Sequence, residues 1–248
     1  MVLEIKNLIK NYKDFKAVDI KELNIKEGES FGFLGPNGAG KTTTISILSG
    51  IYSKYSGEVK IFGKNIKSNP VFIMKNLGVV PQDLALIDDL TAEENIKFFG
   101  ELYGLRGKQL KEAVKETLEF VGLWDRRKDF PPKFSGGMKR RLNIACAIVH
   151  KPKLIIFDEP TVGIDPQSRN NILETIKKLN EQGSTIIYTS HYVEEVDALC
   201  SDICIVDHGQ IIARGTNEEL KALVKHEDGS TASLEEVFLH LTGRSLRD

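Results

Sequence analysis

Residues 35–42 read GPNGAGKT, and this segment indicates how the sequence on either side of it folds. It matches the pattern G-x-x-x-x-G-K-[ST]. It follows an apolar run at 30–34, typical of a strand, and precedes one at 45–48, typical of a helix. In this context the glycines let backbone N–H groups turn towards phosphate oxygens, and the helix N-terminus adds positive potential. The segment therefore predicts a site for a nucleoside triphosphate.

The side chains of this loop have separate expected roles. Lys41 is expected to neutralise the β- and γ-phosphates, and Thr42 to place its hydroxyl on Mg²⁺. The alternative, a glycine-rich turn that fits the pattern by chance, is disfavoured by the flanking strand and helix. The residues predicted to bind the nucleotide here are Gly35, Pro36, Asn37, Gly38, Ala39, Gly40, Lys41, Thr42 and Thr43.

Two carboxylates follow the apolar run that begins at Leu154. This run is apolar at successive positions, which indicates a strand buried on both faces in a parallel sheet, and it ends in Asp158 and Glu159. We expect Asp158 to hold the metal ion and Glu159 to accept a proton from the attacking water, or to orient it. The alternative for Glu159 is a solvated loop residue, and a single carboxylate would be interpreted as a strand terminator.

Strand-like runs alternate with helical patterns along much of the chain, which favours the α/β class. Between Gln82 and Lys151 helix signals replace the strands. Thr91 and Glu94 have the spacing of a capping box, residues 111–121 are amphipathic, and Ser135 begins a third helix. We therefore expect an all-helical insertion in an α/β core. The strand-like runs are 3–5, 23–25, 30–34, 59–62, 78–80, 154–158, 184–189 and 203–206.

The composition of the 248 residues excludes several classes of protein. The formal net charge is −1, so no global field would attract nucleic acid or an anionic membrane. No apolar run reaches the ~18–20 residues that span a bilayer, and the N-terminus lacks a signal-peptide pattern. Cys146, Cys200 and Cys204 form no CxxC pair, which favours small buried hydrophobes over a disulfide or a zinc site. We expect a cytosolic protein unless another component holds it at a membrane.

Further segments resemble motifs of the ATP-binding proteins of ABC transporters, in the same order. Residues 134–138 read FSGGM and resemble the signature LSGGQ, while Gln82 is similar to the Q-loop glutamine. His191 resembles the switch histidine, and Tyr12, in an early turn, resembles the aromatic residue that stacks on adenine. Taken singly, these would be a helix start, structural residues and a surface tyrosine. Together, from about Leu3 through Gly215, they identify the chain as a member of this family.

The resemblance implies roles for residues that the pattern alone leaves open. The chain departs from the family pattern at Phe134 and Met138, so the resemblance does not carry over the polar contact of the usual glutamine to ribose or phosphate. Val162 replaces the usual D-loop serine. Asp165 also has the position of an N-cap before Pro166. The implied catalytic residues are Glu159, His191 and Gln82; the implied metal ligands are Thr42, Gln82 and Asp158; the further nucleotide contacts are Tyr12, Val18, Ser135, Gly136, Gly137 and Asp165.

The implied fold is a P-loop NTPase core of the ABC ATPase type, with an inserted all-helical subdomain and an N-terminal antiparallel β region. The ATP-binding core is expected at 1–82 and 151–215, the helical signature subdomain at 83–150, and a short helical tail at 216–248. In the family, two such domains pair head to tail. Each ATP then lies between the phosphate loop of one and the signature of the other.

The resemblance also implies partners and a location. We expect Mg-ATP as cofactor, a second copy or a homologous ATPase subunit, and a separate membrane permease at the cytoplasmic face of the membrane. The tail at 234–247 resembles that of stand-alone ATPases of ABC-2 type exporters, which favours export. The alternatives are a cytosolic ABC ATPase acting on ribosomes or DNA, and another P-loop enzyme. The chain has neither a second cassette nor a coiled-coil arm, and it lacks an Asn-Lys-x-Asp guanine reader.

Overall fold

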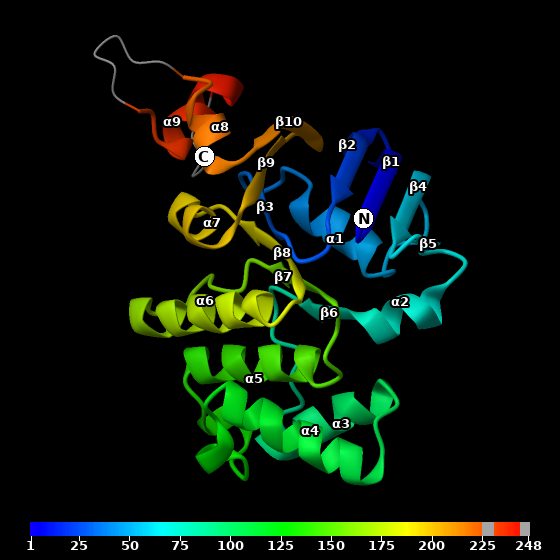
Figure 1. Cartoon of the computed structure of the whole chain (residues 1–248), viewed down its shortest axis with the longest axis vertical. Helices are drawn as coiled ribbons and strands as arrows, with labels where there is room; N and C mark the ends of the chain where they lie inside the picture. Colours follow the sequence, from blue (N-terminus) through cyan, green and yellow to red (C-terminus); the bar gives the residue numbers. More distant parts are fainter. Residues whose placement is uncertain (225–230, 244–248) are drawn as a thin grey trace. The chain divides into compact units, whose positions relative to one another are not determined.

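The computed structural model describes residues 1–224 and 231–243. It consists of two compact units: unit 1 contains residues 1–73 and 185–248, and unit 2 contains residues 74–184. Figure 1 shows the elements of both. The predicted division into a split core, a signature subdomain and a tail is a different partition, by function, and stays a prediction.

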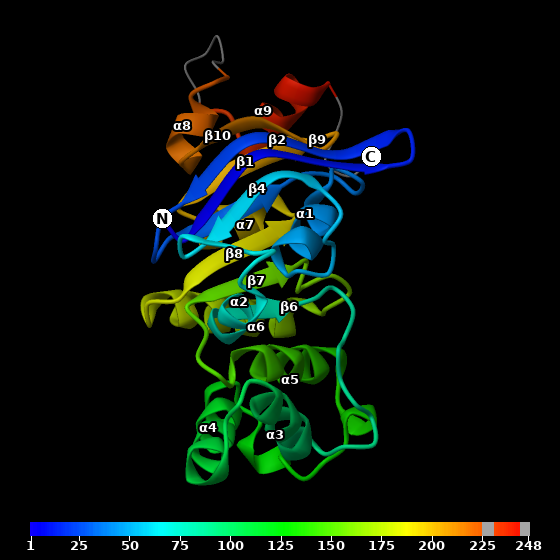
Figure 2. The ribbon, with the colours of Figure 1, turned by 90° about the vertical axis from the view of Figure 1, so that its right-hand side faces the viewer.

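An antiparallel sheet occupies the N-terminal part of unit 1. Its strands are β1 (Leu3–Tyr12), β2 (Phe15–Ile25), β4 (Ser56–Ile61) and β5 (Lys64–Asn65), in the order β2-β1-β4-β5. β2, β1 and β4 lie side by side in Figure 2. Leu3 lies between Ile25 and Ile61 in this sheet, and all three side chains are buried. The alternation of buried and exposed positions gives the sheet one apolar face.

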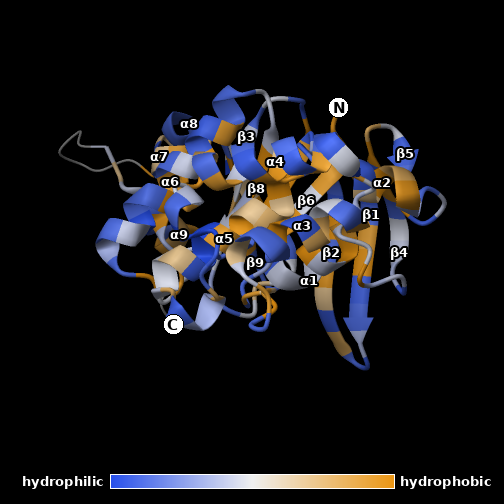
Figure 3. Ribbon diagram, turned by 90° about the horizontal axis from the view of Figure 1, so that it is seen from below, coloured by the Kyte–Doolittle hydropathy of each residue, from blue (hydrophilic) through white to orange (hydrophobic). Residues whose placement is uncertain are grey.

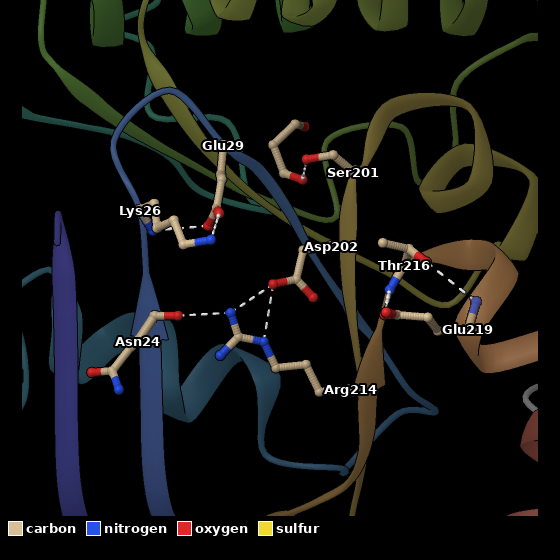
Figure 4. Close-up of polar contacts among 9 residues, drawn as sticks. Asn24, Lys26, Glu29, Ser201, Asp202, Arg214, Thr216 and Glu219 are labelled. Atoms are coloured by element: carbon tan, nitrogen blue, oxygen red, sulfur yellow. Dashed lines mark hydrogen bonds and ion pairs between the residues drawn. The ribbon is translucent and has the colours of Figure 1, made fainter.

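A parallel set of strands in unit 1 carries the glycine-rich loop. β3 (Ser30–Leu34) pairs in parallel with β8 (Thr185–Ser190) and β9 (Asp202–Asp207), and β10 (Gln210–Gly215) is antiparallel to β9. All five residues of β3 are buried, as expected for a strand covered on both faces. Neither β5 nor β10 was predicted. In Figure 4 the Arg214 guanidinium donates to the Asp202 carboxylate and to the Asn24 carbonyl, so β10 is joined to β9 and β2.

The helices of unit 1 are short. α1 (Lys41–Leu48) follows β3, and α7 (Val193–Leu199) packs on β3 and β8. A Cβ atom at Gly32 would lie 2.7 Å from Val196, so this packing requires glycine. α8 (Asn217–Lys221) and α9 (Leu234–Thr242) form the C-terminal part. Residues 225–230 and 244–248 of the predicted tail at 216–248 lie outside the described residues. α2 (Pro70–Asn76) crosses the sequence boundary between the units.

Unit 2 combines two parallel strands with the predicted helical insertion. β6 (Leu77–Val80) pairs with β7 (Leu154–Asp158), and the helices are α3 (Ala92–Leu102), α4 (Gly107–Phe120), α5 (Gly136–Ile148) and α6 (Pro166–Glu181). Short 3-10 turns lie at Trp124–Arg126 and Pro131–Lys133. The capping box of Thr91 and Glu94 is present, with both reciprocal hydrogen bonds. Hydrophobic and hydrophilic positions mix along α4 in Figure 3, as expected for an amphipathic helix.

These elements confirm the predicted α/β class, the N-terminal antiparallel region and the helical insertion. The three cysteines are free and buried, as predicted, and burial raises the pKa of the Cys200 thiol to about 12. Within residues 1–224 and 231–243, no helix is both long enough and apolar enough to cross a bilayer.

Candidate nucleotide site

The glycine-rich loop of unit 1 joins the end of β3 to the start of α1. Gly38 and Gly40 have φ angles of 80° and 98°, in the left-handed region that other residues avoid. A Cβ atom at Gly35 would lie 2.3 Å from the Val206 carbonyl oxygen, and one at Gly40 would lie 2.4 Å from the Ala17 carbonyl oxygen. Both glycines are therefore required by neighbouring backbone, and the backbone of residues 35–40 forms a cradle.

Two other segments of unit 1 hold this cradle in shape. The Gly209 amide donates to the Ala39 carbonyl at 2.9 Å, and the Gly209 carbonyl accepts from the Asp19 amide at 2.7 Å. The Gly35 amide donates to the Ser190 carbonyl at 3.4 Å. Gly209 was not predicted from the sequence, because the turn between two strands gives no local sign that it contacts the loop.

Lys41 points back into the loop. Its Nζ atom donates to the carbonyl oxygens of Gly35 at 2.7 Å and Pro36 at 3.0 Å, and the residue is 4% exposed. A cation inside a backbone cradle, at the N-terminus of α1, fits a phosphate group. Thr42, the next residue, is exposed. Of the other predicted loop residues, Asn37 is exposed, Ala39 is buried and Thr43 is half-buried.

Tyr12 belongs to an exposed aromatic pair. It is the last residue of β1 rather than part of the turn, and it is 41% exposed. Its ring lies edge-on to that of Tyr52, with centroids 6.1 Å apart, and Lys10 Nζ lies 4.9 Å from the Tyr12 ring centre. The hydrogen bond to Tyr12 is the main cause that raises the pKa of Tyr52. Val18, by contrast, is fully buried in β2. Tyr52 was not identified from the sequence.

His191 follows β8 in a segment that is fixed on both sides. Ser190 Oγ donates to Glu195 Oε2 at 2.8 Å and accepts from the Tyr192 amide at 2.9 Å. Tyr188 donates its hydroxyl to the same Glu195 oxygen at 2.8 Å, and Glu195 is 1% exposed. Because the Ser190 carbonyl also accepts from Gly35, unit 1 brings the start of the glycine-rich loop next to the His191 segment.

The two carboxylates at the end of β7 are buried in unit 2. Asp158 is 3% exposed and Glu159 is 5% exposed. Glu159 has a φ of 46°, in the left-handed region. A non-glycine residue there carries about 1–3 kcal/mol of strain, and such residues concentrate at functional sites. The burial of Glu159 argues against a solvated loop residue, and its catalytic role stays a prediction.

The signature segment begins α5. Ser135 caps the helix by accepting a hydrogen bond from the Met138 amide at 3.3 Å. Ser135 and Gly136 are exposed, whereas Gly137 is buried. Phe134, which departs from the family pattern, is 6% exposed and belongs to the core. The start of α5 is thus exposed at Ser135 and Gly136, and an exposed helix N-terminus is suited to an anion.

Asp165 caps α6, as predicted. Its carboxylate accepts from the Ser168 amide at 2.9 Å, and hydrogen bonds from Ser168 hold the pKa of Asp165 below its ordinary value. Gln82 is exposed, and its backbone carbonyl oxygen accepts a hydrogen bond from the Arg140 guanidinium at 2.6 Å. Arg140, on the signature helix, also donates to the Pro81 carbonyl at 2.7 Å. Arg140, which joins the Gln82 segment to α5, was not predicted from the sequence.

Known proteins resemble this chain over most of its length. The family model that matches residues 18–162 is described as "ABC transporter". The linearmycin resistance ATP-binding protein LnrL of Bacillus subtilis is 52% identical over 219 residues, covering 88% of this chain and 70% of the relative. The daunorubicin/doxorubicin resistance ATP-binding protein DrrA of Streptomyces peucetius is 39% identical over 220 residues, covering 89% and 67%.

Solved structures show the same fold. An ATP-binding subunit of an ABC transporter superposes with a TM-score of 0.85 at 29% identity, covering 98% of this chain and all of the other. A dimeric ATP-binding cassette in a post-hydrolysis state, bound to ADP and Pi, superposes with a TM-score of 0.78 at 28% identity, covering 86% of this chain and 98% of the other.

Proposed function

The chain belongs to the ABC transporter family as an ATP-hydrolysing subunit, and from this premise we propose which of its residues bind and hydrolyse ATP and which transport the hydrolysis drives. Lys41 and the backbone of residues 35–43 bind the β- and γ-phosphates of ATP. Ser135 and the amides of Gly136 and Gly137 bind the γ-phosphate from a second chain, paired head to tail. Asp165 and Val18 lie close to the same nucleotide. The dimeric solved relative, bound to ADP and Pi, supports the pairing.

The observation that carries this proposal is the position of Lys41. Its ammonium is enclosed by the loop and bonded to two carbonyl oxygens, on a backbone that two other segments brace. A charged donor that is already oriented costs little reorganisation when an anionic oxygen replaces its carbonyl partners. The same arrangement, with Tyr12 exposed on the hairpin of unit 1, supports adenine stacking on that ring.

Mg²⁺ would be held by Thr42, Gln82 and Asp158. Their hydroxyl, amide and carboxylate oxygens are ligands that Mg²⁺ prefers, and the residues described contain no cluster of three or more His, Cys, Asp or Glu suited to a metal. One carboxylate with oxygen ligands of other kinds matches the usual way in which Mg²⁺ is held together with nucleotide phosphates. When bound, the ion neutralises charge on the β- and γ-phosphate oxygens.

The chemical step uses residues that this chain supplies. Glu159 accepts the proton of the attacking water, and Gln82 and His191 complete the catalytic set. The Ser190–Glu195 hydrogen bond keeps the backbone on both sides of His191 in place. The exposed N-terminus of α5 adds positive potential where negative charge develops on the γ-phosphate.

We further propose that hydrolysis drives export through a separate membrane permease. The relatives named above are ATP-binding proteins of linearmycin resistance and of daunorubicin/doxorubicin resistance, and a third is the Nod factor export ATP-binding protein I of Cupriavidus metallidurans. The chain would then be held at the cytoplasmic face of the membrane through that permease. A cytosolic ATPase acting on ribosomes or DNA is not favoured by these relatives.

The substitution Glu159→Gln tests this function. It removes the proton acceptor and leaves Lys41, Thr42 and Asp158 to hold Mg-ATP, so ATP should bind while turnover stops. An ATP-bound dimer should then accumulate in size-exclusion chromatography. Glu181→Gln removes the same charge from an exposed end of α6 and serves as the control. Hydrolysis by Glu159→Gln near the wild-type rate would refute the role of Glu159.

A further inference from the structure

The two glycines of the signature segment differ in their surroundings. A Cβ atom at Gly136 would meet only ordinary contact, 3.7 Å from Ile164 Cδ1, whereas one at Gly137 would lie 2.2 Å from Ser168 Oγ and 2.4 Å from Ser168 Cβ. Gly136 is exposed and Gly137 is buried. Gly136 therefore has open space beside it where a ligand could lie. At Gly137 the Ser168 side chain occupies the space that a side chain of residue 137 would need.

Ser168 cannot move away from this contact by changing its rotamer. Rotation about the Cα–Cβ bond would displace Oγ, but it leaves Cβ where it is. The backbone of Ser168 is in turn fixed in the first turn of α6, where its amide donates to the Asp165 carboxylate at 2.9 Å. The Ser168 hydroxyl also bonds to Asp165. A larger residue at 137 must therefore push the start of α5 away from the start of α6.

We propose that Ser168 is a positioning residue for the signature segment, acting through Gly137. Its side chain fills the space above Gly137 and sets the distance between the N-termini of α5 and α6, two helices of unit 2 that pack together (Figure 1). Ser135 at the start of α5 and Asp165 at the start of α6 then belong to one rigid body. Gly137 is required by this packing whether or not nucleotide is bound.

The consequence for catalysis rests on the proposed function. If Ser135 and the Gly136 amide meet a γ-phosphate, a displaced α5 misplaces them. A shift of about 1 Å in a catalytic group can cost about 100-fold in rate. ATP binding by the loop at 35–43, which lies in unit 1, does not depend on this contact. The proposal therefore predicts a loss in kcat with an unchanged affinity of the single chain for ATP.

Thermal stability without nucleotide tests the contact itself. Alanine ordinarily stabilises a helix relative to glycine, so Gly136→Ala should leave the Tm unchanged or raise it. Gly137→Ala should lower the Tm by about 2–12 °C, because it overpacks the contact. Added to Gly137→Ala, Ser168→Ala keeps the clashing Cβ and should not restore the Tm. Ser168→Gly leaves only the Cα atom of residue 168, 3.7 Å from a Cβ atom at position 137. The double variant of Gly137→Ala and Ser168→Gly should therefore have the same Tm as Ser168→Gly alone.

Kinetics test the positioning role. Gly137→Ala should lower kcat about 100-fold with the ATP affinity of the monomer unchanged, and Gly137→Ala with Ser168→Gly should regain the kcat of Ser168→Gly. If Ser168→Gly does not restore the Tm, the steric contact is refuted. If the Tm returns but kcat does not, the alanine methyl group at position 137 disturbs the nucleotide directly and Ser168 is no positioning residue. A wild-type protein without ATPase activity would refute the proposed function instead, while the Tm comparison would still decide the contact.

Discussion

The side-chain nitrogen of Lys41 lies 2.7 Å from the carbonyl oxygen of Gly35, six residues earlier in the same loop. The loop is therefore folded around the charge that is expected to meet the phosphates. In the proposed role of Lys41, the ammonium exchanges the carbonyls of Gly35 and Pro36 for phosphate oxygens when ATP binds. Charge-assisted hydrogen bonds to phosphate are stronger than those to a neutral carbonyl, so this exchange is favourable.

Lys41→Ala and Ser135→Arg should each be inactive alone, yet active when mixed. In either homodimer every site has lost one component. In a mixed dimer, the site that combines Lys41 of one chain with Ser135 of the other is whole. With free exchange of chains, about half of the dimers from an equal mixture regain one working site. ATPase activity and ATP-dependent dimerisation of the mixture are the measurements.

The mixing experiment needs its own control, because hydrolysis that required two intact sites would hide the rescue. Subunit exchange is therefore shown first, with chains of different mass. If neither activity nor ATP-dependent dimerisation returns under exchange, Ser135 does not act across the dimer.

Tyr12→Ala should weaken the binding of ATP and GTP equally, by about fivefold, the lower end of the ~1–3 kcal/mol that base stacking contributes. The reason is that an aromatic ring contacts the face of a base and does not distinguish its edge. Phe15→Ala, which removes the exposed aromatic residue paired with Tyr12 across the turn, is the control. Titration with fluorescent nucleotides measures the affinities. Unchanged affinity in Tyr12→Ala would remove this residue from the site.

Ser190→Ala should lower kcat and leave ATP affinity unchanged. The substitution removes the acceptor of the Tyr192 amide and one donor to Glu195, so the segment that carries His191 loosens. Tyr188→Phe is matched, because it removes the other hydroxyl bonded to Glu195 without touching Tyr192. Tyr188→Phe should lower the free energy of urea unfolding by about 1 kcal/mol, as for one hydrogen bond, and Ser190→Ala by about 2 kcal/mol, as for two. Equal losses of kcat in both variants would mean that Ser190 acts only through stability.

His150 should make the stability of the fold depend on pH. Burial lowers the pKa of His150 to about 4, below an ordinary value of 6.5. The His150 ring is stacked on that of Tyr103, with the ring centroids 3.5 Å apart. The unfolded chain therefore binds more protons between about pH 4 and 6.5, and stability falls as the pH is lowered through this window. The loss from this group is on the order of 3 kcal/mol.

His150→Phe keeps a ring against Tyr103 but does not titrate, so its stability should change less between pH 7 and 4.5. Urea unfolding at a series of pH values measures the difference. His208→Gln is the control, because the His208 side chain is 75% exposed. Parallel curves for wild type and His150→Phe would show that His150 is not the source of the pH dependence.

The sequence by itself determined the features that depend on neighbours in the chain. The glycine-rich loop, the capping box of Thr91 and Glu94, and the buried strand that ends in Asp158 are each defined within a few residues. Turn chemistry, helix caps and hydrophobic periodicity act over this range, so their patterns are visible before folding. The order of the motifs was sufficient to identify the family.

Only the tertiary structure decided which distant residues shape the site. Gly209 bonds to Ala39, Glu195 is buried under the segment of His191, and Ser168 fills the space beside Gly137. These pairs belong to different elements, and no local pattern marks them. Their contacts depend on how strands and helices pack, which follows from burial summed over the whole unit and not from the residues on either side.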